Sequence, residues 1–461
     1  MLASETLKAF RDGTLELHCP EMVLRQRAAE SPAEYKGAGI IRQDREQQLE
    51  FVLLENGPMP SPATGLTRML ANVGSVGQLV PEDRYYSLQA KDLRGWTWTA
   101  DRLPICHDSG PGGAVVCGKP WVLDHTEEAT ETASSLLLEI GGNVEIPCAK
   151  FTESTIRAGD GEQRISRRNR AEFQAGEWRV STTREDGFLL LEAMSPRRTA
   201  DHIETRMLEA LQYVTGRTLV WRFVGKTEEL RSTTSLRSEP VKLSLQQMLP
   251  PIEHHRHDLG GQATWTLFDL YLRHIMRFRG DNRFQMHPLS AWLHYVRSAS
   301  AASIFTQGLA LGVAVEGVLE GEFRDVGSPP KGYIDAVGDL TRHVDSWSGD
   351  LNVKKRTLGA INAMRSARAK DRLLALAAEA IVQKRDVDAW DRIRNRGAHA
   401  RPPESSERQE WIDDCHKTSV LLHHLLFRAI GYQGLYTDYG AANWPAKNYA
   451  ASPDTPAAEA K

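Results

Sequence analysis

Three side chains that together could act on RNA lie within six residues of the sequence: Arg394, Asn395 and His399. Imidazole titrates near neutral pH, so His399 is suited to taking and giving a proton. The guanidinium of Arg394 is always charged, and its planar fork matches phosphate oxygens. Asn395 can hold the imidazole or the phosphate by hydrogen bonds. RNA carries its own nucleophile, the 2′-hydroxyl, so such a set of groups is suited to cleaving it without a metal ion.

The spacing of these residues decides whether they can meet. Side chains five positions apart on a straight helix point about 140° away from each other. Arg394 and His399 therefore converge only if the helix ends or bends at Gly397, or if a second copy of the chain approaches. Pro402 and Pro403 stop the helix soon afterwards. On composition alone, a solvated helix end explains the segment equally well.

The pattern Arg-Asn-x-x-x-His, from Arg394 to His399, resembles the R-x4-6-H signature of the HEPN superfamily, in its common form with a polar residue directly after the arginine. HEPN domains are bundles of four or five helices, and many are metal-independent endoribonucleases that work as dimers. Apolar helices precede the motif, a long helix follows it, and a β-rich region lies upstream. This order is similar to that of the ApeA-like anti-phage proteins of bacteria. The resemblance covers residues 300–440 well and the N-terminal half only loosely.

The resemblance implies roles for the motif residues. His399 would act as acid and base, Arg394 would stabilise charge developing on the phosphate, and Asn395 would hold either group. Two copies of the motif would meet at a dimer two-fold, and the products would end in a 2′,3′-cyclic phosphate. No cofactor and no metal ion are implied. Arg396 could help to bind substrate, although the family pattern gives it no role.

A carboxylate, Glu316, lies in the middle of a strongly apolar helix expected at residues 301–323. Burying such a group costs several kcal/mol unless it is paired. An acidic residue late in an early apolar helix is similar to the HEPN pattern, and Arg394 is its natural partner. We expect a buried pair. The alternative is that Glu316 lies on a narrow exposed stripe.

Apolar periodicity predicts further helices around the motif. They are expected at about 263–276, 332–346, 358–384, 386–399 and 405–430. Trp390 and Ile393, three positions apart, are expected to face a core. The helix at 358–384 would carry a basic face that includes Arg365, Arg368 and Arg372. This face could hold an RNA backbone, and a solvated charged face is equally compatible with the pattern.

Short apolar runs separated by turn residues predict a β-rich N-terminal domain, either a sandwich or an open barrel. One hairpin is expected from residues 136–140 and 144–146, and a second strand pair from 176–180 and 187–191. A helix at about 199–214 and a strand at 218–224 would complete this domain. The fold class is therefore α+β and multidomain, with an all-α, HEPN-like bundle at the C-terminus. The expected divisions are residues 1–230 (β-rich, regulatory), 231–300 (connection and first helices), 301–440 (bundle) and 441–461 (flexible tail).

Composition and charge exclude several classes of function. The net charge of the 461 residues is −3, and acidic side chains outnumber basic ones in residues 1–230. The chain is therefore not a general binder of polyanions, and RNA contacts must depend on local clusters. Five scattered cysteines favour a reducing compartment. We see no membrane-spanning run and no secretory signal, so we expect a cytoplasmic protein. No cysteine or histidine spacing fits zinc.

The preferred hypothesis is an endoribonuclease that serves as a regulated toxin in anti-phage defence. Its partners would be RNA, a second copy of the chain bound through the HEPN domain, and a phage-derived trigger at the N-terminal domain; no membrane is involved. One alternative is a non-catalytic HEPN module that binds RNA or a nucleotide. The other is a helical scaffold for a partner protein.

Overall fold

The computed structural model divides the chain into two compact units. We call them the sheet unit and the helical unit. The sheet unit comprises Met1–Val144, Lys150–Ala200 and Leu219–Lys242, and the helical unit comprises Glu145–Ala149, Asp201–Thr218 and Leu243–Lys461. The structure describes residues 4–27, 30, 32–55, 80–110, 113–129, 133–158, 161–196, 202–238, 246–279, 285–398 and 404–450. The expected α+β architecture, with a β-rich N-terminal half and a helical C-terminal half, is confirmed.

The sheet unit begins with a helix, α1 (Ser4–Arg11), and its described strands form one antiparallel sheet. The strands are β1 (Glu16–Gln26), β2 (Glu34–Gln43), β3 (Leu49–Glu55), β4 (Tyr86–Lys91), β5 (Thr97–Leu103), β6 (Cys106–Gly110), β7 (Gly113–Gly118), β8 (Val122–Glu128), β9 (Ser134–Gly141), β10 (Lys150–Ala158), β11 (Gly161–Ala175), β12 (Trp178–Glu185), β13 (Phe188–Ser195), β14 (Trp221–Glu228) and β15 (Arg231–Arg237). Their order in the sheet is β10-β11-β12-β13-β9-β14-β15-β8-β5-β4-β1-β2-β3-β7-β6.

Side-chain alternation explains how these strands bury one face. In β1, Leu17, Cys19, Met22 and Leu24 are buried and most residues between them are exposed. The strand keeps this pattern in spite of a register shift between Cys19 and Met22, where one extra residue is accommodated. Phe10 of α1 is fully buried in the same core, so the N-terminal helix packs on the sheet.

One of the two expected hairpins is present. β12 and β13 pair directly, from Arg179 opposite Met194 to Glu185 opposite Phe188, and this prediction is confirmed. The hairpin expected from 136–140 and 144–146 is wrong. β9 instead pairs with β13 on one side and with β14 on the other. Val144 and Ile146 are buried outside any strand, so their apolar character reflects burial rather than pairing.

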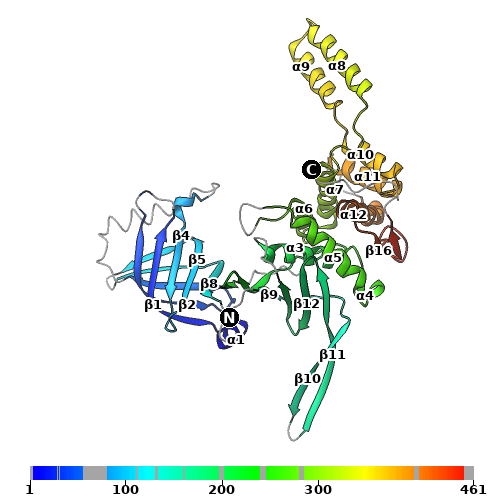
Figure 1. Cartoon of the computed structure of the whole chain (residues 1–461). Helices are drawn as coiled ribbons and strands as arrows, with labels where there is room; N and C mark the ends of the chain where they lie inside the picture. Colours follow the sequence, from blue (N-terminus) through cyan, green and yellow to red (C-terminus); the bar gives the residue numbers. More distant parts are fainter. Residues whose placement is uncertain are drawn as a thin grey trace. The chain divides into compact units, whose positions relative to one another are not determined.

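The helical unit contains a short two-stranded sheet beside its helices (Figure 1). Its elements are α3 (Ile203–Thr215), α4 (His254–His257), α5 (Gln262–Ile275), α6 (Pro288–Ser300), α7 (Ile304–Glu322), α8 (Lys331–Ser346), α9 (Leu351–Ala363), α10 (Ala369–Ala378), α11 (Lys384–Ala398), the 3-10 turn η2 (Ser405–Glu407), α12 (Arg408–Ile430), β16 (Gly434–Thr437) and β17 (Ala446–Tyr449).

The structure differs from the expected divisions at two places. The helix expected to complete the β-rich domain, α3, belongs to the helical unit, where Tyr213 packs on Tyr271 of α5 with ring centroids 4.4 Å apart. Residues 446–449 of the expected flexible tail form β17, which pairs with β16 and buries Tyr449. Residues 451–461 lie outside the described part of the chain.

The single long helix expected at 358–384 is wrong, because two helices occupy this stretch. α9 ends at Ala363, and α10 begins after the N-cap residue Arg368, whose backbone N–H donates a hydrogen bond to the Asp371 carboxylate at 3.1 Å. Residues 365–372 contain no large apolar side chain, and the prediction treated their charged residues as the polar face of one continuous helix.

α8 and α9 form a helical hairpin inserted between α7 and α10 (Figure 1). α8 buries only Val337 and α9 buries only Ile361. The hairpin therefore exposes several large apolar side chains: Tyr333, Leu340, Trp347, Leu351 and Val353. The chain segments before and after the hairpin lie close together. A Cβ atom placed on Gly327 would stand 3.3 Å from the carbonyl oxygen of Asp371.

α7 is long and apolar enough to cross a membrane by length and composition. The expectation that no run comes near this length is therefore wrong. Its contacts give another physical reason for its composition, because it packs against α6, α11 and α12. Leu311, Val315, Val318 and Leu319 are fully buried in these contacts. We therefore describe α7 as the central helix of the unit.

Candidate functional site

The motif helix, α11, lies against α7 and α12 (Figure 1). Ile393 is fully buried and Trp390 almost fully, so the prediction that both face a core is confirmed. The indole Nε1 of Trp390 donates a hydrogen bond to the carbonyl oxygen of Gly312 in α7 at 3.2 Å. This contact holds α11 in a rotation that leaves Arg394, the residue after Ile393, exposed to solvent.

Arg394 and Glu316 form the ion pair that the sequence suggested. Nε of Arg394 donates to Oε1 of Glu316 at 2.6 Å, which joins α11 to α7. The expectation of a buried pair is wrong, because the side chains are 49% and 39% exposed, respectively. Glu316 lies three residues after the exposed Val313, on an exposed stripe of α7. An exposed pair of this kind contributes at most about 1 kcal/mol to stability.

The pair leaves part of the guanidinium available. Among the described residues, Arg394 makes its side-chain hydrogen bond through Nε, and Nη1 and Nη2 make none. A guanidinium held by one edge can offer its remaining N–H groups to phosphate oxygens in a fixed direction. Glu316 thus orients Arg394 without closing it off from solvent.

The other two arginines of the segment, Arg392 and Arg396, pair with carboxylates of α12 and of η2. Arg392 donates two hydrogen bonds to Asp414, and Arg396 donates to Glu407 at 3.3 Å and lies 3.7 Å from Glu410. Arg396 was expected to help bind substrate, but its carboxylate partners already engage it. The role of Arg392 was missed, since nothing in the sequence links it to a residue one helix later.

The remaining motif residues are only partly described. Asn395 is exposed beside Arg394. The helix continues through Ala398, so Gly397 does not end it. His399 lies outside the described residues, and its convergence with Arg394 stays a prediction.

The three arginines expected to form a basic helix face do not share one. Arg365 follows the end of α9 and donates to Thr341 of α8 at 3.2 Å, and Arg368 caps α10. Arg372 is buried, and its Nη1 donates to Glu320 of α7 at 2.8 Å. Because the stretch is split between α9 and α10, the expectation of one continuous helix face is wrong, and binding of RNA by these arginines stays a prediction.

A buried group of charges holds the start of α11. Nη2 of Arg385 donates to both carboxylate oxygens of Asp438 at 2.7 Å, next to the fully buried Asp386. Burial raises the pKa of Asp386 to about 7. Burial alone would also raise the pKa of Asp438, but hydrogen bonds from Arg385 and Lys447 outweigh it and lower that pKa. The group thereby attaches the motif helix to the β16–β17 ribbon.

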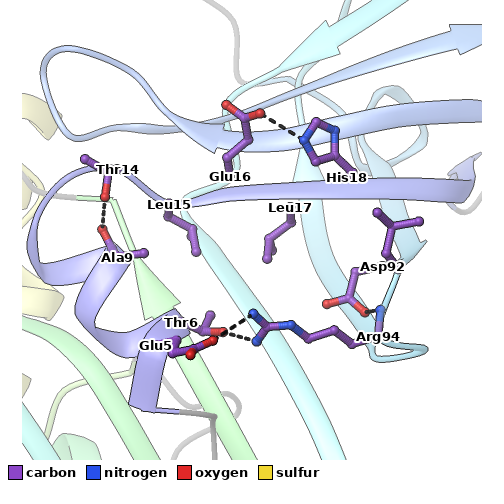
Figure 2. Close-up of a pocket in the computed structure, with 11 residues that line it drawn as sticks. Glu5, Thr6, Ala9, Thr14, Leu15, Glu16, Leu17, His18, Asp92 and Arg94 are labelled. Atoms are coloured by element: carbon purple, nitrogen blue, oxygen red, sulfur yellow. Dashed lines mark hydrogen bonds and ion pairs between the residues drawn. The ribbon is translucent and has the colours of Figure 1, made fainter.

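A cavity of about 380 Å³ in the sheet unit is a separate candidate for ligand binding. It lies between α1, the start of β1 and the turn that joins β4 to β5 (Figure 2). Arg94 reaches across it, donating to Oγ1 of Thr6 at 2.8 Å and lying 3.7 Å from the carboxylate of Glu5. Both carboxylate oxygens of Asp92 are engaged, because Oδ1 accepts from the backbone N–H groups of Arg94 and Trp96, and Oδ2 accepts from the indole Nε1 of Trp98.

No group of three or more His, Cys, Asp or Glu side chains among the described residues could hold a metal ion. Comparison of the chain with protein-family models, with curated proteins and with solved structures gives no match. The resemblance to HEPN proteins therefore depends on the motif and its helical setting alone.

Proposed function

We propose that this protein is a metal-independent, HEPN-like endoribonuclease that acts as a regulated toxin in bacterial anti-phage defence. The observation that carries the proposal is the Glu316–Arg394 pair. It joins the central helix to the motif helix and directs a guanidinium to the surface, beside Asn395 and five residues before His399. A solvated helix end would need no partner from a second helix.

In the proposed reaction, His399 takes the proton of the RNA 2′-hydroxyl, which attacks the adjacent phosphorus. The bond to the 5′-oxygen breaks, and the same or a second imidazole returns a proton to that oxygen. Arg394 stabilises the charge that builds on the phosphate. The products would be a 2′,3′-cyclic phosphate and a 5′-hydroxyl, and no cofactor takes part.

The proposal includes a homodimer formed by the helical unit. On a straight helix Arg394 and His399 diverge, so residues from two copies together would complete a site. Arg394 is half exposed and Asn395 is exposed, which leaves both accessible to a second copy and to RNA. We further propose that the sheet unit receives a phage-derived trigger, for which the cavity beside Arg94 is a candidate place, and that the protein acts in the cytoplasm.

The test compares cells that express the wild type with cells that express Arg394→Ala, His399→Ala or Arg396→Ala. Arg396→Ala is the matched control, because it removes an equal charge two residues away from a side chain already engaged by Glu407. Wild type and control are expected to arrest growth and fragment a defined RNA, with cyclic phosphate ends. The Arg394 and His399 variants are expected to be silent at equal expression.

The outcome also separates the alternatives. If no RNA is cleaved, with or without phage challenge, and purified wild type binds RNA more tightly than the two motif variants, the protein is a binding module. If wild type and variants behave alike in growth, cleavage and binding, the motif is structural. A helical scaffold for a partner protein is then the better explanation.

A further inference from the structure

Two of the five cysteines face each other across the edge of the sheet. Cys106 of β6 is directly opposite Cys117 of β7, in an antiparallel register that runs to Gly110 opposite Gly113. Directly opposite residues in such a pair have Cα atoms about 4.5–5.5 Å apart. A disulfide spans Cα atoms about 4.4–6.8 Å apart. The backbone therefore needs little movement to join these sulfurs.

The thiols of Cys106 and Cys117 are also more accessible to solvent than those of the other three cysteines. Cys106 is exposed and Cys117 is half-buried, whereas Cys19, Cys148 and Cys415 are buried. Burial raises the pKa of Cys19 and of Cys415 to about 12, which suppresses their reactive thiolate forms. Burial, followed by the neighbouring Cys106 thiol, raises the pKa of Cys117. The exposed Cys106 is thus the better placed to react first.

We infer that Cys106 and Cys117 are a redox-modifiable dithiol that low-molecular-weight disulfides convert into an intramolecular disulfide. The Cys106 thiolate attacks one sulfur of the small disulfide and releases one small thiolate. The Cys117 thiolate then attacks Sγ of Cys106 and releases the second. Two protein thiols lose two protons and two electrons in total, and the small disulfide gains them as two thiols.

The position of the pair gives the bond a structural effect. Among the strands that the structure describes, β6 is the terminal one and pairs with β7 alone, while β7 also pairs with β3. Terminal strands are paired along one edge only and open more readily than central ones. A disulfide would fasten β6 covalently to β7 and slow the local opening of this edge. Because the pair lies in the sheet unit, the inference does not depend on the proposed nuclease site.

The test uses the full-length protein, oxidised glutathione as the oxidant, and mass spectrometry after alkylation of the remaining thiols. The expected product has lost two alkylation sites, carries no glutathione, and yields a peptide that joins Cys106 to Cys117. Cys106→Ser and Cys117→Ser are the matched controls. Each should retain glutathione as a mixed disulfide on its remaining thiol of the pair, because no second thiol is present to release it.

Two outcomes would overturn the inference. The wild type could accumulate glutathione on Cys106 or Cys117, which would show that the sulfurs cannot meet. Both thiols could also stay alkylatable at oxidant concentrations that modify a small thiol peptide. If the disulfide forms, hydrogen exchange of the β6 amides is expected to slow, and dithiothreitol should restore the original rate. An unchanged rate would refute the structural effect.

Discussion

The guanidinium of Arg392 donates two parallel hydrogen bonds to the carboxylate of Asp414, from Nε to Oδ2 at 2.8 Å and from Nη2 to Oδ1 at 2.5 Å. The Asp414 side chain is only 5% exposed. The paired carboxylate holds the pKa of Arg392 above its usual value, chiefly through the hydrogen bonds. Two arginines separated by a single residue thus have different tasks, since Arg392 holds the motif helix on α12 and Arg394 points outward.

This difference predicts that two nearby substitutions lower the stability of the protein by different amounts. Arg392→Ala leaves a buried carboxylate with Lys417 at 3.9 Å as its nearest described cation. It should lower the free energy of unfolding by about 1–3 kcal/mol. Arg394→Ala removes an exposed pair and should cost less than about 1 kcal/mol. Urea denaturation followed by circular dichroism measures both. Equal losses would mean that the Arg392–Asp414 bond is not formed in solution.

Glu316→Gln should separate stability from activity, if the proposed nuclease function is correct. The pair with Arg394 is exposed, so the free energy of unfolding should fall by less than about 1 kcal/mol. The rate of RNA cleavage should fall at least about tenfold, because the guanidinium loses its fixed direction. Glu320→Gln is the matched control on the same helix, one turn later. A cleavage rate that Glu316→Gln leaves unchanged would exclude Glu316 as a positioning residue.

Buried histidines of α12 predict a loss of stability in mild acid. Burial lowers the pKa of His423 to about 4 and that of His424 to about 3. In the unfolded chain the histidine pKa is about 6.5. Between the lowered folded pKa values and this unfolded value, the unfolded chain therefore binds more protons than the folded chain. Their contribution to stability is therefore complete above pH 6.5 and is lost as the pH falls toward 4. Buried Asp386 and Glu209, whose pKa values are raised to about 7, act in the opposite direction over a similar range.

A difference measurement isolates the histidine contribution. His424 packs between Tyr436 and Tyr449, with ring centroids 4.7 Å and 4.9 Å away, so His424→Phe keeps an aromatic ring there. Relative to the wild type, this variant should gain stability steadily from pH 7 down to pH 4. Asp386 and Glu209 are present in both proteins and cancel in the difference. A difference that does not change with pH would show that His424 is not buried in its neutral form.

The α8–α9 hairpin should be removable. It buries one side chain from each helix, and its ends at Gly327 and Asp371 are already close. Replacing residues 331–366 with a short Gly-Ser linker should therefore lower the unfolding midpoint of the helical unit by only a few degrees, in keeping with the small apolar area lost. Thermal unfolding of the shortened protein and of the wild type under the same conditions measures the change in midpoint. Failure of the shortened protein to fold would mean that the hairpin supports the unit.

Local patterns predicted part of this structure well. The strand pair β12–β13, with its short turn, and the amphipathic helices α8 and α12 were expected because periodicity and turn residues lie within one segment. The partner strands of β9 could not be expected in this way, since they come from later parts of the chain. The break between α9 and α10 was missed because Arg368 and Asp371 lie in the polar stretch 365–372, which was interpreted as the charged face of one helix.

The candidate site shows the same division. The pairing of Glu316 with Arg394 was expected because an isolated carboxylate in an apolar helix needs a partner, whereas its exposure depends on which face of α7 is covered. The bond from Arg392 to Asp414 joins two helices and leaves no sequence signal. The pairing of Cys106 with Cys117 could have been found, because both are equally distant from the turn residues Gly110 and Gly113.

The path of the chain between the two units has a consequence for how the protein is made. The chain enters the helical unit at Glu145–Ala149 and again at Asp201–Thr218 before β14 and β15 complete the sheet. β9 pairs with β14, and β8 pairs with β15, only after the ribosome has synthesised the chain as far as residue 237. In the helical unit, α3 is synthesised well before the helices on which it packs. Long-range pairings of this kind fold slowly. The nascent chain thus emerges with both units unfinished, so a product truncated anywhere before the last helices carries no assembled motif bundle.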